Sequence, residues 1–183
     1  MRTILKAAGS HPKTFVETGC WKGITVGRVM GEAQTFSERL FDHAYSIEMN
    51  GARYRQCRRK FNHRADITMI YGDSRVELPK LIKELPDPVC FWLDAHKCGR
   101  DTAGDNDNPP TCDELDIVLA RVVPGDIVAI DDINEEKQQY SLRSPLAPLI
   151  EKIDSFGRPR EVLFFSSENG QREGEVMVIT CPG

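Results

Sequence analysis

Short runs of apolar residues recur along the chain, and longer stretches of mixed apolar and polar positions separate most of them. The short runs are rich in β-branched and aromatic residues, which favours strands, whereas apolar residues three or four positions apart favour helices. The pattern predicts strands over Thr14–Glu17, Ala44–Glu48, Thr68–Tyr71, Val89–Leu93, Ile127–Ile130, Glu161–Phe165 and Val176–Thr180. It predicts helices over Ile24–Gly31, Ala52–Phe61, Val76–Glu84, Cys112–Val122 and Pro145–Phe156.

The order of these elements predicts an α/β fold. Strands and helices alternate through the first five strands, which is typical of a mostly parallel sheet with helices on both faces. Only the polar segment Ser166–Gly174 joins the last two strands, so we expect them to pair as an antiparallel hairpin. No repeat, low-complexity tract or linker divides the sequence, which predicts a single domain over residues 1–183.

Two segments exceed ordinary loop length, Glu32–His43 and Lys97–Thr111. A long polar loop inside a compact domain is usually functional or disordered. Lys97–Thr111 follows a predicted strand end, where open α/β sheets bind their ligands. This loop could act as a lid over the acceptor, or it could equally be a solvated insertion. In both cases we expect it to be more mobile than the sheet, because it has few apolar anchors.

Composition narrows the class of protein. With 183 residues, 40% of them hydrophobic, the chain can bury one sizeable core. A net charge of −4 argues against nucleic acid as a general partner, and the basic residues of Arg53–Lys60 are expected to form a solvated helix face. No apolar stretch is long enough to cross a membrane or serve as a signal, so we expect a cytoplasmic protein whose six cysteines are reduced.

The end of the first predicted strand carries a glycine-rich turn. It reads Glu17-Thr-Gly19-Cys-Trp21-Lys-Gly23 and lies between a strand and a helix. Glycines allow the backbone to approach a ligand closely, and the first turn of the helix offers unpaired N–H groups. The turn is therefore a candidate ligand-binding loop, although a strand-to-helix turn also uses glycine for steric reasons alone.

The next two predicted strands also end in polar side chains. Glu48 lies one βαβ unit after the glycines, where a carboxylate can accept hydrogen bonds from two ribose hydroxyls. Asp73 and Ser74 follow the third strand and suit an adenine amino group. They could equally cap the helix that begins near Val76, and both roles are compatible.

These strand-end clusters resemble the class I S-adenosylmethionine-dependent methyltransferases, in particular the catechol O-methyltransferase-like branch, from Phe15 to Thr180. The run Phe91–His96 also looks like the fourth-strand motif of small bacterial and phage methyltransferase-like proteins. The resemblance implies a Rossmann-like, seven-stranded methyltransferase sheet with bound S-adenosylmethionine. It assigns the cofactor to Glu17, Gly19, Trp21, Gly23, Glu48, Asp73, Ser74 and Asp94.

The fourth and fifth strands deliver further acidic groups. Asp94 and His96 follow the fourth strand and are the candidate catalytic residues, whereas Asp131 and Asp132 follow the fifth. Three carboxylates at neighbouring strand ends repel one another unless a cation joins them, which predicts Mg²⁺, Mn²⁺ or Ca²⁺ on Asp94, Asp131 and Asp132. The metal-dependent O-methyltransferases resemble this arrangement, but capping and pairing with arginines remain open.

The leading hypothesis is methyl transfer to an oxygen of a small molecule or glycan, and whether a divalent metal assists the transfer is left open. A metal-independent N-methyltransferase is less favoured, because Asp94 is followed by Ala-His-Lys and not by the Pro-Pro-aromatic signature for exocyclic amines. A non-catalytic module that binds a nucleoside cofactor remains a third hypothesis. The chain has almost no N-terminal extension and no inserted cap, so the two long loops or another subunit would select the acceptor.

Overall fold

The computed structural model describes residues 1–32, 38–86, 88–95, 110–133, 146–157, 160–166 and 176–181. Within these ranges the helices are α1 Arg2–Ala8, α2 Ile24–Val29, α3 Gly51–Lys60, α4 Ser74–Leu81, α5 Pro110–Arg121 and α6 Leu146–Ser155. The strands are β1 Thr14–Thr18, β2 His43–Glu48, β3 Ile67–Tyr71, β4 Val89–Leu93, β5 Ile127–Ile130, β6 Glu161–Phe165 and β7 Val176–Thr180.

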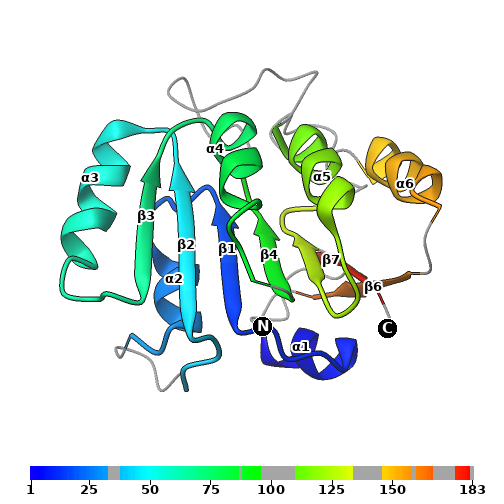
Figure 1. Cartoon of the computed structure of the whole chain (residues 1–183), viewed down its shortest axis with the longest axis horizontal. Coiled ribbons are helices and arrows are strands. Elements are labelled where there is room, and N and C mark those ends of the chain that lie inside the picture. Colours follow the sequence, from blue (N-terminus) through cyan, green and yellow to red (C-terminus); the bar gives the residue numbers. More distant parts are fainter. Residues whose placement is uncertain are drawn as a thin grey trace.

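The strands form a seven-stranded sheet in the order β3-β2-β1-β4-β5-β7-β6. The first five strands are parallel, and their carboxyl ends lie together along the upper edge in Figure 1. β7 pairs antiparallel with both β5 and β6. The predicted seven-stranded, mostly parallel sheet with a C-terminal antiparallel hairpin is therefore confirmed.

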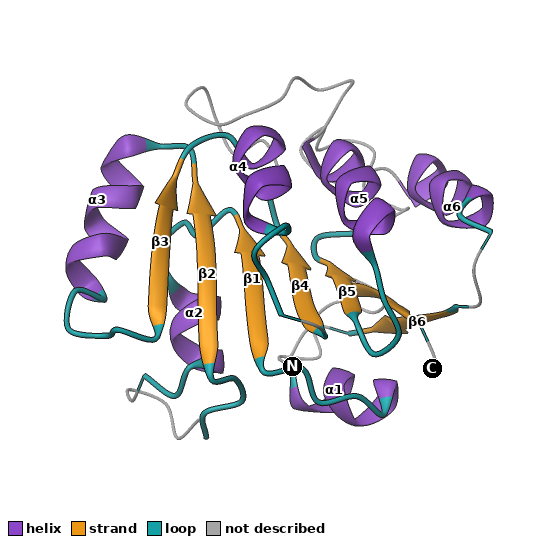
Figure 2. Cartoon of the chain, viewed as in Figure 1, coloured by secondary structure: helices purple, strands orange, loops and turns teal. Residues whose placement is uncertain are grey.

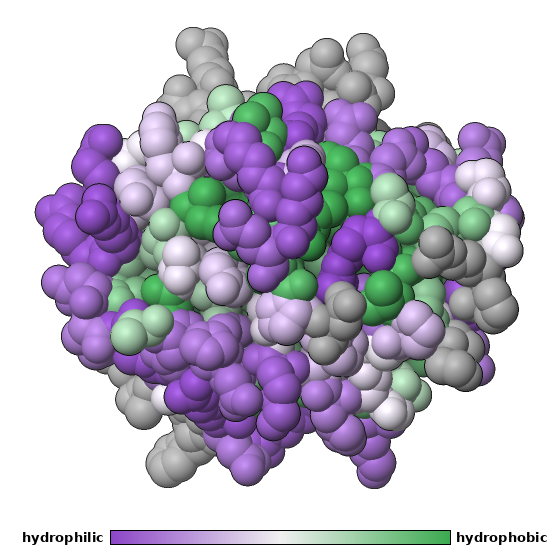
Figure 3. All heavy atoms as spheres, in the orientation of Figure 1, coloured by the Kyte–Doolittle hydropathy of each residue, from purple (hydrophilic) through white to green (hydrophobic). Residues whose placement is uncertain are grey.

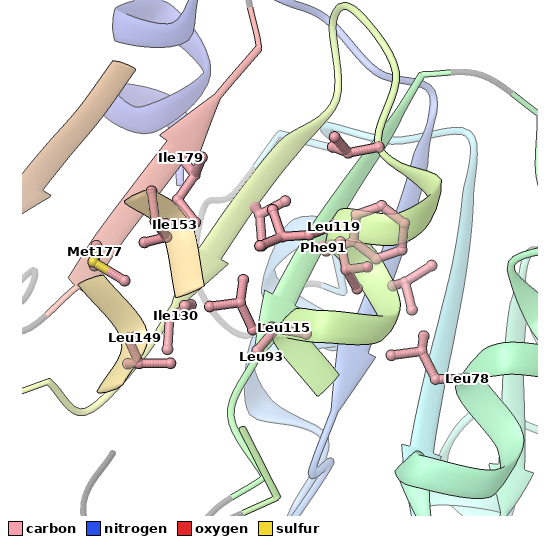
Figure 4. Close-up of a cluster of buried hydrophobic side chains, with 14 of the residues drawn as sticks. Leu78, Phe91, Leu93, Leu115, Leu119, Ile130, Leu149, Ile153, Met177 and Ile179 are labelled. Atoms are coloured by element: carbon pink, nitrogen blue, oxygen red, sulfur yellow. The ribbon is translucent and has the colours of Figure 1, made fainter. Parts of the chain in front are cut away.

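Helices cover both faces of the sheet (Figure 2). Strand residues alternate between two buried apolar clusters, as the period of a strand requires. On one face α4, α5 and α6 pack on Phe91, Leu93, Ile130 and Met177 (Figure 4). On the other face α1, α2 and α3 pack on Phe15, Ala44, Ile67 and Trp92.

The short helix α1 was missing from the sequence prediction. Ile4 and Leu5 are its buried residues and join the second cluster. Gly9 follows the last helical residue in the left-handed conformation, with φ 60°. A glycine at this position is typical of a helix end, so the sequence could have indicated where α1 ends. Seven residues were too few for a periodic apolar pattern to stand out.

Hydrophilic side chains dominate the face that α4, α5 and α6 form, and hydrophobic ones lie in separate areas among them (Figure 3). Among the described helices, none has the length and apolar character that a membrane span requires.

Candidate functional site

A pocket of about 390 Å³ lies at the carboxyl edge of the sheet. Residues at the ends of β1, β2, β4 and β5 line it, together with the start of α4 and α5. Five of the residues predicted to bind the cofactor line this pocket: Gly19, Trp21, Glu48, Ser74 and Asp94. The structure therefore brings together residues that are up to 75 positions apart in the sequence.

The loop between β1 and α2 is held in a left-handed conformation at alternate residues. Gly19, Trp21 and Gly23 have φ of 81°, 45° and 63°. At Gly19 a Cβ atom would lie 2.6 Å from the backbone oxygen of Asp94, so β1 and β4 meet there with no room for a side chain. Trp21 is 50% exposed at the pocket, and the Lys22 ammonium lies 4.6 Å from the centre of its ring.

Two backbone N–H groups fix the carboxylate of Glu48. Trp21 N donates to Oε2 at 3.0 Å, and Asn50 N donates to Oε1 at 2.7 Å. The side chain is almost fully buried, yet it lines the pocket. A carboxylate has about four lone-pair sites, so two of them remain for a ligand's hydroxyl groups.

Glu17 lies behind the pocket and does not line it. Its side chain is 1% exposed and accepts a hydrogen bond from Ser46 Oγ at 2.5 Å. Burial raises the pKa of Glu17 to about 8, and the nearby charge of Asp94 adds to the rise, while the Ser46 hydrogen bond opposes it. The predicted contact between Glu17 and the cofactor stays a prediction, and the geometry gives Glu17 a supporting position.

Asp73 and Gly23 also lie outside the lining of the pocket. Asp73 is the N-cap of α4, as the sequence allowed, and accepts a hydrogen bond from Arg75 N at 2.9 Å. The Arg75 guanidinium pairs with the same carboxylate at 2.7 Å, which lowers the pKa of Asp73. Gly23 packs against α3, because a Cβ there would lie 2.6 Å from the Phe61 ring.

The acidic residues predicted to bind a metal all line the pocket. Asp94 N donates to the Thr18 backbone oxygen and to Thr18 Oγ1, each at 3.2 Å, which fixes the start of the loop after β4. Asp131 Oδ1 accepts from Asp132 N at 2.9 Å, and Asp132 has a left-handed φ of 58°.

These carboxylates do not form a metal site in the described part of the chain. No three His, Cys, Asp or Glu side chains come close enough there to hold a metal ion. The described side chains therefore do not support a divalent cation at Asp94, Asp131 and Asp132, and metal assistance stays a prediction. His96 and most of the predicted lid, Lys97–Thr111, lie outside the described residues.

Several residues of the site were not predicted from the sequence. Ile24 and Met49 add apolar surface, and Arg53 at the start of α3 adds a cation. Ile24 follows the glycine-rich turn, and Met49 and Arg53 follow Glu48. Their positions after the same strand ends could therefore have identified them from the sequence.

Glu114 is a buried acidic residue that contacts the end of β1. It is fully buried on α5 and accepts from Thr18 Oγ1 at 2.9 Å. Burial raises its pKa to about 7 against the hydrogen bonds of Ser74 and Thr18. Sequence alone offered no signal for this position, because Glu114 lies within a run of acidic residues, Asp113–Asp116.

The sequence matches no protein-family model and no curated protein. The fold, in contrast, matches many solved structures. The SAH-bound methyltransferase PaMTH1 from Podospora anserina shares 14% identity over 100% of this chain and 77% of its own, with a TM-score of 0.57. An rRNA methylase from Streptococcus thermophilus shares 11% identity over 99% of this chain and 93% of its own, with a TM-score of 0.59.

The N-methyltransferase NodS from Bradyrhizobium japonicum, solved in complex with S-adenosyl-L-homocysteine (SAH), is similar at the same level. It shares 9% identity over 97% of this chain and 80% of its own, with a TM-score of 0.54. These likenesses show that the chain has the class I methyltransferase fold, as the sequence resemblance implied. The acceptors named for these structures differ, so the likeness does not select one.

Proposed function

We propose that this chain transfers a methyl group from S-adenosylmethionine to an oxygen atom of a small molecule or glycan. The observation that carries the proposal is the pocket in which Gly19, Glu48 and Asp94 meet from β1, β2 and β4. Its volume of about 390 Å³ lies within the ordinary range for small-ligand sites, about 300–1,000 Å³. Structures of the same fold with bound SAH support this choice of cofactor.

The residues of the pocket suit the nucleoside half of that cofactor. Glu48 is oriented by two backbone N–H groups before any ligand binds, so little ordering is needed to accept hydrogen bonds from the ribose. Ile24, Ile47 and Met49 offer apolar surface for adenine, and Ser74 adds a hydroxyl. Gly19 lets the ligand approach the backbone closely.

The acidic end of the pocket suits the reacting half. S-adenosylmethionine supplies an electrophilic methyl group on a positively charged sulfur. Asp94, Asp131 and Asp132 at this end favour a cation over an anion. Asp94 would hold the acceptor hydroxyl and take its proton as the oxygen gains the methyl group, which is general-base catalysis. His96 keeps its predicted catalytic role as a proposal.

A second acceptor class has one observation in its favour. All the arginine, lysine, aspartate and glutamate positions of α3 are occupied by basic residues, and Arg53 from this helix lines the pocket. A row of cations attracts phosphates, so methyl transfer to a nucleic-acid base is the second candidate. The acidic end formed by Asp94, Asp131 and Asp132 is the reason to place it second, because it repels a phosphate backbone near the methyl group.

The cofactor assignment is tested by calorimetric titration with SAH. We expect Glu48→Ala to bind SAH about 10- to 100-fold more weakly than the unchanged protein, since it loses hydrogen bonds to a charged group. Glu84→Ala removes an exposed carboxylate outside the pocket and should leave the affinity unchanged. An unchanged affinity in Glu48→Ala, or no SAH binding by the unchanged protein, would refute the assignment.

The acceptor class is tested with methyl-labelled S-adenosylmethionine. The protein is incubated separately with a panel of small hydroxyl compounds, a panel of glycans and purified rRNA. We expect label on an oxygen of a small molecule or glycan. Label on rRNA would select the second candidate, and SAH binding without transfer to any panel would support a non-catalytic cofactor-binding module.

A further inference from the structure

Two thiols are in contact where the loop between β1 and α2 packs on α3. Cys20 lies on the loop after β1, Cys57 lies on α3, and their Sγ atoms are 3.2 Å apart. Both side chains are buried, with 3% and 0% of their surface exposed. The pair therefore joins two segments of the pocket wall that are 37 positions apart in sequence.

The backbone of Trp21 links this thiol pair to Glu48, the carboxylate that we propose binds the ribose. Cys57 Sγ donates to the Trp21 backbone oxygen at 3.5 Å, and Cys20 Sγ lies 3.9 Å from the same oxygen. The N–H group of Trp21 donates to Glu48 Oε2 at 3.0 Å. A change at the two sulfur atoms therefore affects Trp21, whose N–H group holds the Glu48 carboxylate in place.

We propose that Cys20 and Cys57 form an oxidisable dithiol site, which a peroxide converts into a disulfide, and that this bond weakens cofactor binding. The disulfide itself is independent of the enzymatic activity. Its effect on cofactor binding rests on the proposed function.

The reaction needs only hydrogen peroxide as the oxidant. The Cys57 thiolate attacks one peroxide oxygen, the O–O bond breaks, and water leaves after protonation, which makes Cys57 a sulfenic acid. The Cys20 sulfur then attacks Cys57 Sγ, the S–S bond forms, and the S–O bond breaks to release a second water. Two thiols lose two electrons and two protons, and one peroxide is reduced to two waters.

Cys57 is the thiol that reacts first. The Cys20 thiol donates its hydrogen bond toward Cys57, which lowers the pKa of Cys57 although burial opposes the effect, and the charge of Lys60 lowers it further. The Lys60 ammonium is held beside the loop by a hydrogen bond to the Gly23 backbone oxygen at 2.9 Å. Hydrogen peroxide is close to water in size, so it needs only a local opening of the loop to reach the pair.

The disulfide would change the loop in two ways. A disulfide has a sulfur–sulfur distance of about 2.05 Å, so the two sulfur atoms must approach by about 1 Å, and the loop that carries Cys20 shifts with them. The oxidised sulfur atoms also have no proton to donate to the Trp21 oxygen. Trp21 has a strained φ of 45°, and movement of its peptide would displace the N–H group that fixes Glu48.

Cys90 provides the matched control. It is fully buried in β4, and burial raises its pKa to about 12, so it stays protonated and unreactive. The experiment treats the unchanged protein, Cys57→Ser and Cys90→Ser with hydrogen peroxide. Disulfides are then mapped by mass spectrometry under non-reducing conditions, and SAH affinity is measured before and after reduction with dithiothreitol.

We expect a Cys20–Cys57 cross-link in the unchanged protein and in Cys90→Ser. In both, SAH affinity should fall by about fivefold or more and return on reduction, since a displacement of about 1 Å is large for a preorganised site. Cys57→Ser should keep its affinity in peroxide. Absence of the cross-link in the unchanged protein would overturn the dithiol site, whether or not the serine variants fold.

A cross-link that leaves SAH affinity unchanged would overturn the effect on cofactor binding. If the reduced protein binds no SAH, the proposed function fails, yet disulfide mapping still decides whether the dithiol site exists. The two failures are therefore distinguishable.

Discussion

Gly19 lines the pocket and has a backbone conformation that favours glycine. Its φ of 81° favours glycine, and a Cβ would lie 2.6 Å from the backbone oxygen of Asp94. Backbone atoms of a central strand end cannot yield as a flexible side chain can. Gly19 therefore lets β1 and β4 converge at the point where the cofactor is proposed to bind.

Gly19→Ala should lower the free energy of unfolding by about 2–4 kcal/mol, through the left-handed φ and the steric clash together. Gly9→Ala is the control, because Gly9 has a φ of 60° with nothing within 4 Å of the added Cβ, and it should cost only about 1 kcal/mol. Urea unfolding of both variants gives the comparison. Equal losses would mean that the contact with Asp94 is not limiting.

At the scale of elements, α4 and α3 begin next to the pocket and each carries an N-cap. Asp73 accepts from Arg75 N, and Asn50 accepts from Ala52 N and Arg53 N. The two caps stabilise their helices in the same way, but only for Asp73 does the sequence also predict a contact with adenine. This difference separates a capping role from a binding role.

Asp73→Ala and Asn50→Ala should each lower the free energy of unfolding by about 1 kcal/mol, as loss of an N-cap does. SAH affinity should fall several-fold more in Asp73→Ala, because that variant also loses the adenine contact. Thermal unfolding and calorimetry on the same samples measure both effects. Equal affinities in the two variants would leave Asp73 as a cap alone.

At the scale of the whole molecule, Glu17 and Glu114 are buried carboxyl groups whose pKa values are raised toward neutral pH. Burial raises the pKa of Glu17 to about 8 and that of Glu114 to about 7, from an ordinary value of 4.5. Between about pH 5 and pH 8 the folded protein therefore holds protons that the unfolded chain has released. Stability must fall as the pH rises through this range and level off above it.

The expected slope is about 1.4 kcal/mol per pH unit for each carboxyl group within its range. Glu17→Gln and Glu114→Gln should each flatten the dependence, since an amide does not titrate. Glu38→Gln, which alters an exposed side chain paired with Arg2, should leave the slope as it is. Urea unfolding at pH 5, 6, 7 and 8 tests this, and a slope in both buried variants equal to that of the unchanged protein would refute it.

The sequence by itself determined the elements and the edge of the sheet at which the site lies. Strand and helix periods are local properties of the chain, so every predicted strand is found close to its expected position. In a parallel sheet the carboxyl ends share one edge, which is why Gly19, Glu48 and Asp94 could be assigned to one pocket without knowing the strand order.

Only the tertiary structure decided which of these side chains face the pocket and what surrounds them. Glu17 and Glu48 both lie within the last two residues of a strand, yet Glu17 is buried against Ser46 whereas Glu48 lines the pocket. The contact of Cys20 with Cys57 likewise requires the loop after β1 to pack on α3. Such contacts depend on strand order and packing between distant segments, and the periodicity of a single segment carries no information about its neighbours in space.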